Sequence, residues 1–234
     1  MAYVRDSIGS SGLTLLLVAL VLWCVATSVH AHNVATDSAA YISKLEGPAI
    51  GAFLYLGAKH MVTGADHLLY LLGVSFFLSH FRDVLLLASL FALSHSLTLI
   101  GGVWLDWQVS AALIDAVIGL SVVYKAFENV GGFGARWPIS PAQAVFGFGL
   151  LHGLGLATKL QALGLSENGL LTNLLSFNVG VELGQVFSLG IMLVLLSLWR
   201  GRKQNTSVRL IGNGVLMVAG FLFAGSHVID GWLL

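Results

Sequence analysis

Histidine and acidic side chains interrupt the long apolar segments of this sequence, and they are the residues best able to do chemistry. His60, Asp66 and His67 lie together in the first such segment, while His95 and His152 lie near the middle of two later ones. Ionisable groups inside a bilayer are costly and usually mark a function. With two further acids at similar depth, in the outer half of a membrane, they make one candidate set of metal ligands. Its members are His60, Asp66, His67, His95, Asp115, His152 and Glu182.

The residue types in this set indicate which metal chemistry is available. The chain has 8 histidines and 11 acids but a single cysteine, Cys24, so a disulfide framework and a thiolate metal site are both excluded. Imidazole, carboxylate and amide ligands suit a first-row divalent ion such as nickel, cobalt or zinc. For any one histidine the plainer alternative is a hydrogen bond between helices, worth about 0.6 kcal/mol. Several ionisable groups at one depth favour a shared site.

The spacing of the first three ligands predicts a break in their helix. A continuous helix would hold His60 and His67 on one face but about 10 Å apart, too far to bind one ion. A break at Gly64 would let the first part fold back and bring them together. Asp66 and His67 point about 100° apart on a helix. One of them is then a ligand, while the other orients it or serves a second site.

Further polar residues are candidates for a pathway or for orienting the ligands. Asn178, Glu182 and Gln185 follow i, i+4, i+7 spacing and predict one polar stripe. Glu128 and Asn129 lie near the cytoplasmic end of their segment, so Glu128 is expected to help release an ion. Lys125, three residues before Glu128, is expected either to extend its ammonium group to the membrane surface or to pair with that carboxylate.

Composition defines the elements that must position these residues. The chain is 57% hydrophobic and 9% charged, with no net charge, whereas soluble domains have about 25% charged residues. Nucleic-acid binding is not expected, because no basic patch is present. The predicted fold is all-α, a polytopic membrane helix bundle with about six transmembrane helices plus a broken or re-entrant half-helix. The apolar blocks are 49–79, 84–103, 111–129, 142–160, 173–199 and 208–231.

The first block is too long for one straight crossing, at about 46 Å. We therefore expect a half-helix to Thr63, a break at Gly64 and a spanning helix from Ala65. Residues 1–31 read as a signal peptide, with Arg5 before an apolar run and a cleavage site after Ala31. An uncleaved signal anchor is the alternative. Residues 32–47 would be a short external arm, and 48–234 the transmembrane domain.

Charge asymmetry predicts the orientation of the bundle. The loop at 200–209 holds four cations and no anion, which places it in the cytoplasm. The loops around Asp106 and Glu167 then lie outside. We expect a multi-pass protein of a bacterial inner membrane with both termini in the periplasm.

Several motifs resemble the HupE/UreJ family, in particular its second branch. They are GAKHMVTGADHLLYLL (57–72), FALSHSLTL (91–99), Asp115 with LSVVY (120–124) and Glu128-Asn129, FGLLHGLG (148–155) and FNVGVELGQ (177–185). The similarity covers about 47–199 in family order, although the family commonly has glutamate where this chain has Asp115. The resemblance implies a nickel or cobalt permease linked to hydrogenase or urease maturation.

Three functions remain open at this stage, and the first leads. A secondary permease would capture nickel or cobalt, with zinc as a third candidate, at the outer cluster and release it past Glu128. The metal is then a substrate, with no permanently bound cofactor and no enzymatic activity. The alternatives are a membrane-embedded metalloenzyme whose metal activates water, and a non-catalytic assembly protein. The expected partners are the metal ion, the lipid bilayer and metalloenzyme maturation proteins.

Overall fold

The computed structural model describes residues 45–77, 81–134, 139–162, 166–200 and 206–233. The predicted signal peptide and nearly all of the predicted external arm lie outside these ranges. Within them the chain forms helices and no strand, which confirms the all-α prediction. The helices are α2 (Ile50–Thr63), α3 (Ala65–Phe77), α4 (Phe81–Trp104), α5 (Ala111–Asn129), α6 (Pro141–Gln161), α7 (Leu170–Arg200) and α8 (Thr206–Leu233).

Local capping signals explain where two of these helices begin. The Ser110 hydroxyl accepts a hydrogen bond from the Leu113 amide at the start of α5. At the start of α6, Ser140 and Gln143 form a reciprocal capping box, and Pro141 occupies the first turn. Both helices therefore begin within one residue of the predicted blocks.

The first apolar block is broken at Gly64, as predicted. The Gly64 amide donates to the His60 carbonyl at 2.8 Å, and its extended ψ of 106° ends α2. A β-carbon at this position would lie 2.8 Å from the His60 carbonyl oxygen and 2.9 Å from His67 Nδ1. The prediction that a helix from Ala65 spans the membrane by itself is wrong, because the helix is too short. At 13 residues α3 is about 20 Å long, too short to cross a bilayer alone.

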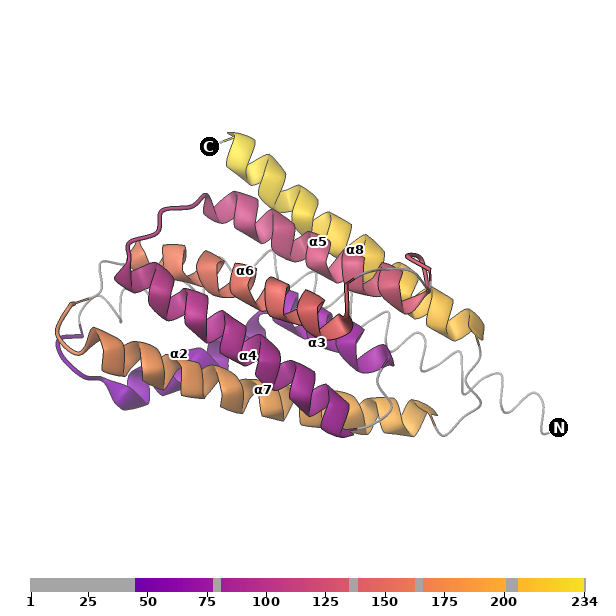
Figure 1. Cartoon of the computed structure of the whole chain (residues 1–234), viewed down its shortest axis with the longest axis horizontal. Helices are drawn as coiled ribbons and strands as arrows, with labels where there is room; N and C mark the ends of the chain where they lie inside the picture. Colours follow the sequence, from indigo (N-terminus) through magenta and orange to yellow (C-terminus); the bar gives the residue numbers. More distant parts are fainter. Residues whose placement is uncertain (1–44, 78–80, 135–138, 163–165, 201–205, 234) are drawn as a thin grey trace.

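After this break the chain continues in the same direction along the bundle instead of turning back. The Ala49 amide, just before α2, donates to Asn173 Oδ1 near the start of α7 at 2.7 Å. Near the end of α2, Met61 packs against Gly184, further along α7. The two helices therefore run parallel, and α3 follows α2 along the long axis of the bundle (Figure 1). Of the two predicted alternatives, a broken helix is observed and a re-entrant one is not.

Three close helix pairs surround α3. They are α2 with α7, α4 with α6, and α5 with α8, while α3 packs against members of all three pairs. The α4–α6 pair is held by Thr98, whose hydroxyl donates to the Leu150 carbonyl at 2.7 Å. Gly153 touches the His95 carbonyl so closely that a β-carbon there would collide with it. This contact brings the backbones at His95 and His152 to the same level.

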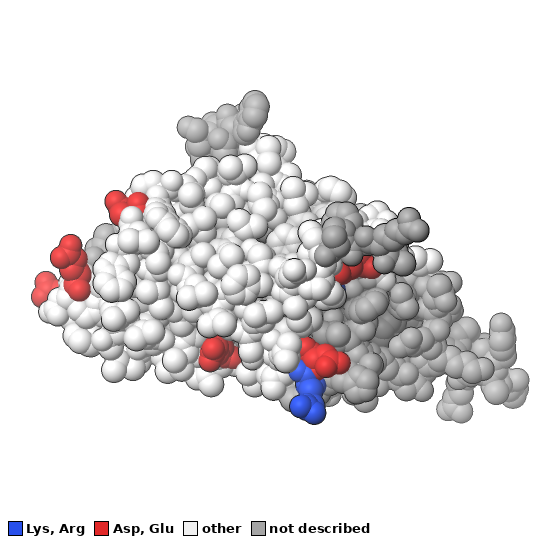
Figure 2. Space-filling view, viewed as in Figure 1, with Lys and Arg blue, Asp and Glu red and all other residues white. Residues whose placement is uncertain are grey.

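The surface of the bundle suits a lipid environment. Leu86, Phe187 and Phe221 are each more than half exposed, and the face in Figure 2 is largely uncharged. Among the described residues, three helices are long and apolar enough to cross a membrane: Arg82–Trp104, Leu170–Leu196 and Leu210–Ile229.

The structure thus shows three candidate crossings and not the predicted six. The two parts of the first block are each too short, and α5 carries Asp115, Lys125 and Glu128 within 19 residues. Helix α6 has 21 residues but is not apolar enough. The sequence prediction counted apolar blocks. Apolar content alone did not account for the break within block 49–79 or for the charges within block 111–129.

Candidate metal centre

Four imidazole rings from four helices meet in the interior of the bundle. His60 lies in the last turn of α2 and His67 in the first turn of α3. His95 and His152 lie near the middle of α4 and α6. The His67 ring lies at the centre of the group. Its centroid is 4.8 Å from that of His60, 5.0 Å from that of His152 and 6.1 Å from that of His95. The break at Gly64 brings His60 and His67 together as the spacing predicted, although the first part of the helix does not fold back as expected.

A carboxylate completes this imidazole centre. Asp66 Oδ1 lies 3.1 Å from His67 Nδ1, without the geometry of a hydrogen bond. Two overlapping ligand sets result, His60–His67–His95 and Asp66–His67–His152, and in each set the ligand atoms lie within 4.8 Å of one another. Two ligands on opposite sides of one ion are about 4 Å apart. Small side-chain movements would therefore close either set around a metal, and His67 belongs to both.

Most ring nitrogens of the imidazole centre lack hydrogen-bond partners. His152 Nδ1 donates to the Phe148 carbonyl at 2.7 Å, which leaves the Nε2 lone pair free to accept. That nitrogen, His60 Nε2 and both ring nitrogens of His67 and His95 are buried without a hydrogen bond. Each unpaired buried polar group costs about 1–3 kcal/mol. So many in one place are groups that a single metal ion could satisfy together.

The structure does not bring Asp115 and Glu182 to the imidazole centre. Lys159 on α6 contacts both carboxylate oxygens of Asp115, at 2.9 and 2.8 Å, and His227 Nδ1 lies 3.7 Å from that carboxylate. Glu182 is exposed on α7. It lies about 40° around the helix from buried Asn178, which is enough to move it past the edge of the packed face.

The two amides of the predicted stripe do lie inside the bundle. Asn178 and Gln185 are buried on α7, whose neighbouring residues Phe177 and Gly180 contact α2. Both amide atoms of Asn178 and Oε1 of Gln185 lack hydrogen-bond partners. They remain candidates for the surroundings of a metal site.

Glu128 and Asn129 belong to a separate inner polar group. Glu128 Oε2 accepts from Lys125 Nζ at 2.6 Å. Asn129 donates to the Gly73 carbonyl of α3 at 2.8 Å and to Asn213 Oδ1 of α8 at 2.9 Å. The predicted Lys125–Glu128 pair is therefore present. This group joins three helices at the other end of α3 from the imidazole centre.

Sequence reasoning missed two partners in these polar groups. Lys159 neutralises Asp115, and Asn213 binds Asn129. Each is a polar residue inside an otherwise apolar block, and that signal was available in the sequence. Neither falls within the motifs of the family resemblance, so neither was singled out.

These features define a helical membrane protein with a buried imidazole–carboxylate centre. The family model described as "HupE / UreJ protein" matches residues 36–230. The chain belongs to this family, and the match extends on both sides of the predicted core at 47–199. Comparisons with curated proteins and with solved structures found no match.

Proposed function

We propose that this protein is a secondary permease for a divalent transition metal, nickel or cobalt, which binds at the imidazole centre. The observation that carries the proposal is the set of buried, unpaired ring nitrogens contributed by four helices. A purely structural core leaves few buried polar atoms unsatisfied and does not gather them from four helices in one place.

Each side chain of the centre has a role in this proposal. His60, His67, His95 and His152 supply neutral nitrogen ligands, which favour nickel and cobalt, with zinc as a third candidate. Asp66 supplies a negative charge beside His67 that offsets the cost of removing water from a dication. The Phe148 carbonyl holds the His152 ring with its lone pair available, as outer partners of metal-bound histidines commonly do.

The broken helix supports transport through a site deep in the membrane. Discontinuous helices with irregular backbone at membrane depth are found where they line a cavity or a binding site. Here α2 and α3 end and begin beside the ligands. We infer that the two together make one crossing, and that α5, whose Asp115 and Lys125 are buried, and α6 make two more. Both termini then lie in the periplasm of a bacterial inner membrane.

The remaining polar residues have different places in the proposal. Glu128 lies on the cytoplasmic side of the centre and helps to release the ion. Asp115 and Glu182 are not assigned as ligands, since one is paired with Lys159 and the other is exposed. The metal is cargo, so no permanent cofactor is proposed. Metalloenzyme maturation proteins are the proposed recipients.

A membrane-embedded metalloenzyme is the second candidate. Each ligand set contains three residues, and three protein ligands with one open position are typical of catalytic zinc sites. An enzyme of this kind would bind metal without moving it across a membrane. The inner polar group around Glu128 favours a path over a single closed site.

Uptake into proteoliposomes tests the proposal directly. Purified protein should carry nickel or cobalt into vesicles, with the other divalent ions offered in competition. The His67→Ala variant, reconstituted at equal density, should not. Binding without uptake would support the metalloenzyme, and absence of binding would leave the assembly protein as the better interpretation.

A further inference from the structure

Tyr70 is an unusual residue in the core of the bundle. It is 1% exposed and is the largest fully buried side chain among the described residues. Its hydroxyl has no hydrogen-bond partner. Burying an unpaired hydroxyl is unfavourable, and phenylalanine would fill the same space without it. A tyrosine here therefore needs a reason beyond packing.

The position of Tyr70 on α3 suggests that reason. His67, Tyr70 and Gly73 follow one another at intervals of three residues, about 4.5 Å each along one side of the helix. His67 lies in the imidazole centre. Gly73 packs against Lys125, whose Cγ would lie 3.2 Å from a β-carbon at that position, and the Gly73 carbonyl accepts from Asn129. Tyr70 thus lies between the imidazole centre and the inner polar group.

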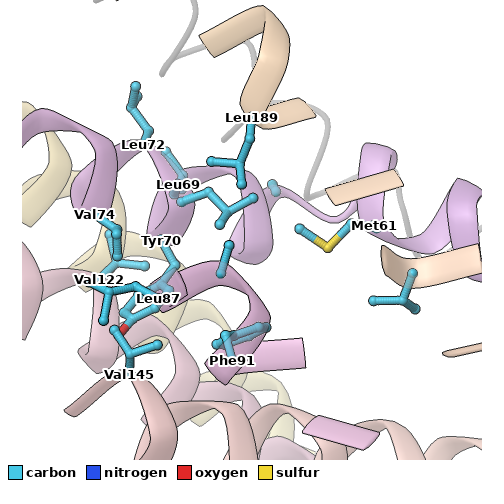
Figure 3. Packing of buried hydrophobic residues seen from close by; sticks show 14 of the residues in the cluster. Met61, Leu69, Tyr70, Leu72, Val74, Leu87, Phe91, Val122, Val145 and Leu189 are labelled. Atoms are coloured by element: carbon cyan, nitrogen blue, oxygen red, sulfur yellow. The ribbon is translucent and has the colours of Figure 1, made fainter. Parts of the chain in front are cut away.

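Ring contacts trace the same direction. The Tyr70 ring centroid is 6.0 Å from that of His152 and 5.8 Å from that of Phe148. Phe148 is in turn 5.3 Å from Tyr124, which precedes Glu128 by one helical turn on α5. Figure 3 shows the Tyr70 oxygen at the tip of its ring within the apolar cluster that includes Val122 and Val145. Within this apolar cluster, the Tyr70 hydroxyl oxygen is the polar atom that lies between the imidazole centre and the inner polar group.

We propose that the Tyr70 hydroxyl is the first oxygen atom offered to the metal ion as it leaves the imidazole centre towards Glu128. The inference rests on the proposed permease function and adds a pathway residue to it. An ion that leaves its imidazole ligands inside an apolar cluster needs a polar contact before it reaches the next carboxylate, because an unsolvated charge there is costly. The hydroxyl supplies this contact during passage and is not needed for equilibrium binding.

The Tyr70→Phe variant separates this role from packing, since it keeps the ring and removes only the oxygen. The matched control is Tyr55→Phe, which makes the same change at an exposed position on α2. We expect Tyr70→Phe to bind nickel or cobalt with a dissociation constant within about twofold of the wild type, because its oxygen is not one of the resting ligands. Initial uptake into proteoliposomes should fall at least about tenfold, the effect of about 1.4 kcal/mol on a barrier. Tyr55→Phe should change neither quantity.

The possible results distinguish the pathway role from the proposed function. Uptake by Tyr70→Phe at the wild-type rate would overturn the pathway role and leave the permease standing. Equal loss of binding and uptake would also overturn it, because Tyr70 would then belong to the binding site itself. A wild-type protein that neither binds nor carries nickel or cobalt would overturn the proposed function, and the role of Tyr70 with it.

Discussion

His67 is the side chain on which the imidazole centre depends most. It lies between His60, His95 and His152 and belongs to both three-residue ligand sets. The other imidazoles each belong to one set. Losing His67 therefore leaves two incomplete pairs, while losing His95 leaves the set that contains Asp66 intact.

Alanine substitutions should rank the ligands accordingly. We expect His67→Ala to weaken nickel binding by at least about 100-fold, because a metal ligand is lost from both sets. His95→Ala should cost less, since one set survives. His227→Ala, beside Asp115, is the control and should leave the affinity nearly unchanged. Isothermal titration calorimetry of the purified variants measures all three, and equal losses in His67→Ala and His95→Ala would contradict the shared position of His67.

The affinity for metal should also depend on pH, with a definite sign. Imidazole binds a metal through the lone pair that a proton would otherwise take, so protons and metal compete. Lowering the pH until the imidazoles bind protons should weaken nickel binding and raise the number of protons released per ion. Calorimetry in buffers of different ionisation enthalpy measures both. An affinity that rises as pH falls would argue against imidazole ligands.

At the scale of the helices, the break at Gly64 brings together His60 and His67, which a continuous helix would keep apart. The break is closely packed, because a β-carbon would crowd both the His60 carbonyl and His67 Nδ1 at distances under 3 Å. Side chains cannot be added there without moving one histidine or the other. The imidazole centre is therefore sensitive to a residue that has no side chain of its own.

Gly64→Ala should lower the metal affinity by about tenfold or more while the helical content stays the same, since helix residues are not lost. Gly51→Ala in α2 is a matched control, because nothing lies within 4 Å of a β-carbon at that position. Circular dichroism checks the fold, and calorimetry checks the affinity. Wild-type affinity in Gly64→Ala would mean that the break is not what positions His60 and His67.

At the scale of the whole molecule, two polar groups lie along the same helix bundle. The imidazole centre joins α2, α3, α4 and α6, and the inner polar group joins α3, α5 and α8. Helix α3 contributes to both, with His67 in its first turn and Gly73 about 9 Å further along. In the proposed permease, this separation divides capture of the ion from its release.

Replacing Glu128 should separate those two stages. Glu128→Gln keeps the shape and removes the charge, so equilibrium binding should stay within about twofold while uptake slows by at least about tenfold. The change also removes the ion-pair partner of buried Lys125, which is destabilising. The double variant Lys125→Met/Glu128→Gln serves as the control for that effect. If Glu128→Gln abolishes binding as fully as His67→Ala does, the two groups form one site and the two-stage path fails.

The proposed orientation of the bundle has its own test. Glu167, exposed in the loop before α7, should lie outside, and Ser207, in the first turn of α8, should lie in the cytoplasm. In a chain whose Cys24 has been replaced, Glu167→Cys should react with an impermeant thiol reagent in intact cells, and Ser207→Cys should react only after lysis. Labelling of Ser207→Cys from outside would reverse the orientation.

The sequence by itself determined the local features of this protein. Apolar blocks predicted α5 and α6 nearly residue by residue, because the pattern that ends a helix acts within one or two helical turns. The spacing of His60, Gly64 and His67 predicted the broken helix and the meeting of two imidazoles across it. The family resemblance also came from short motifs, and the matched region proved longer than expected.

Only the tertiary structure decided which polar residues meet across helices. The predicted depth of Asp115 matched that of the four histidines, yet Asp115 pairs with Lys159, which is 44 residues away in the chain. Glu182 lies one helical turn after Asn178, but packing against α2 buries one side of α7 and leaves the Glu182 side chain exposed on the surface of the bundle. Helix periodicity specifies the face on which a residue lies. Which neighbour covers that face depends on close contacts such as that of Gly153 with His95, and these are formed only when the helices pack together.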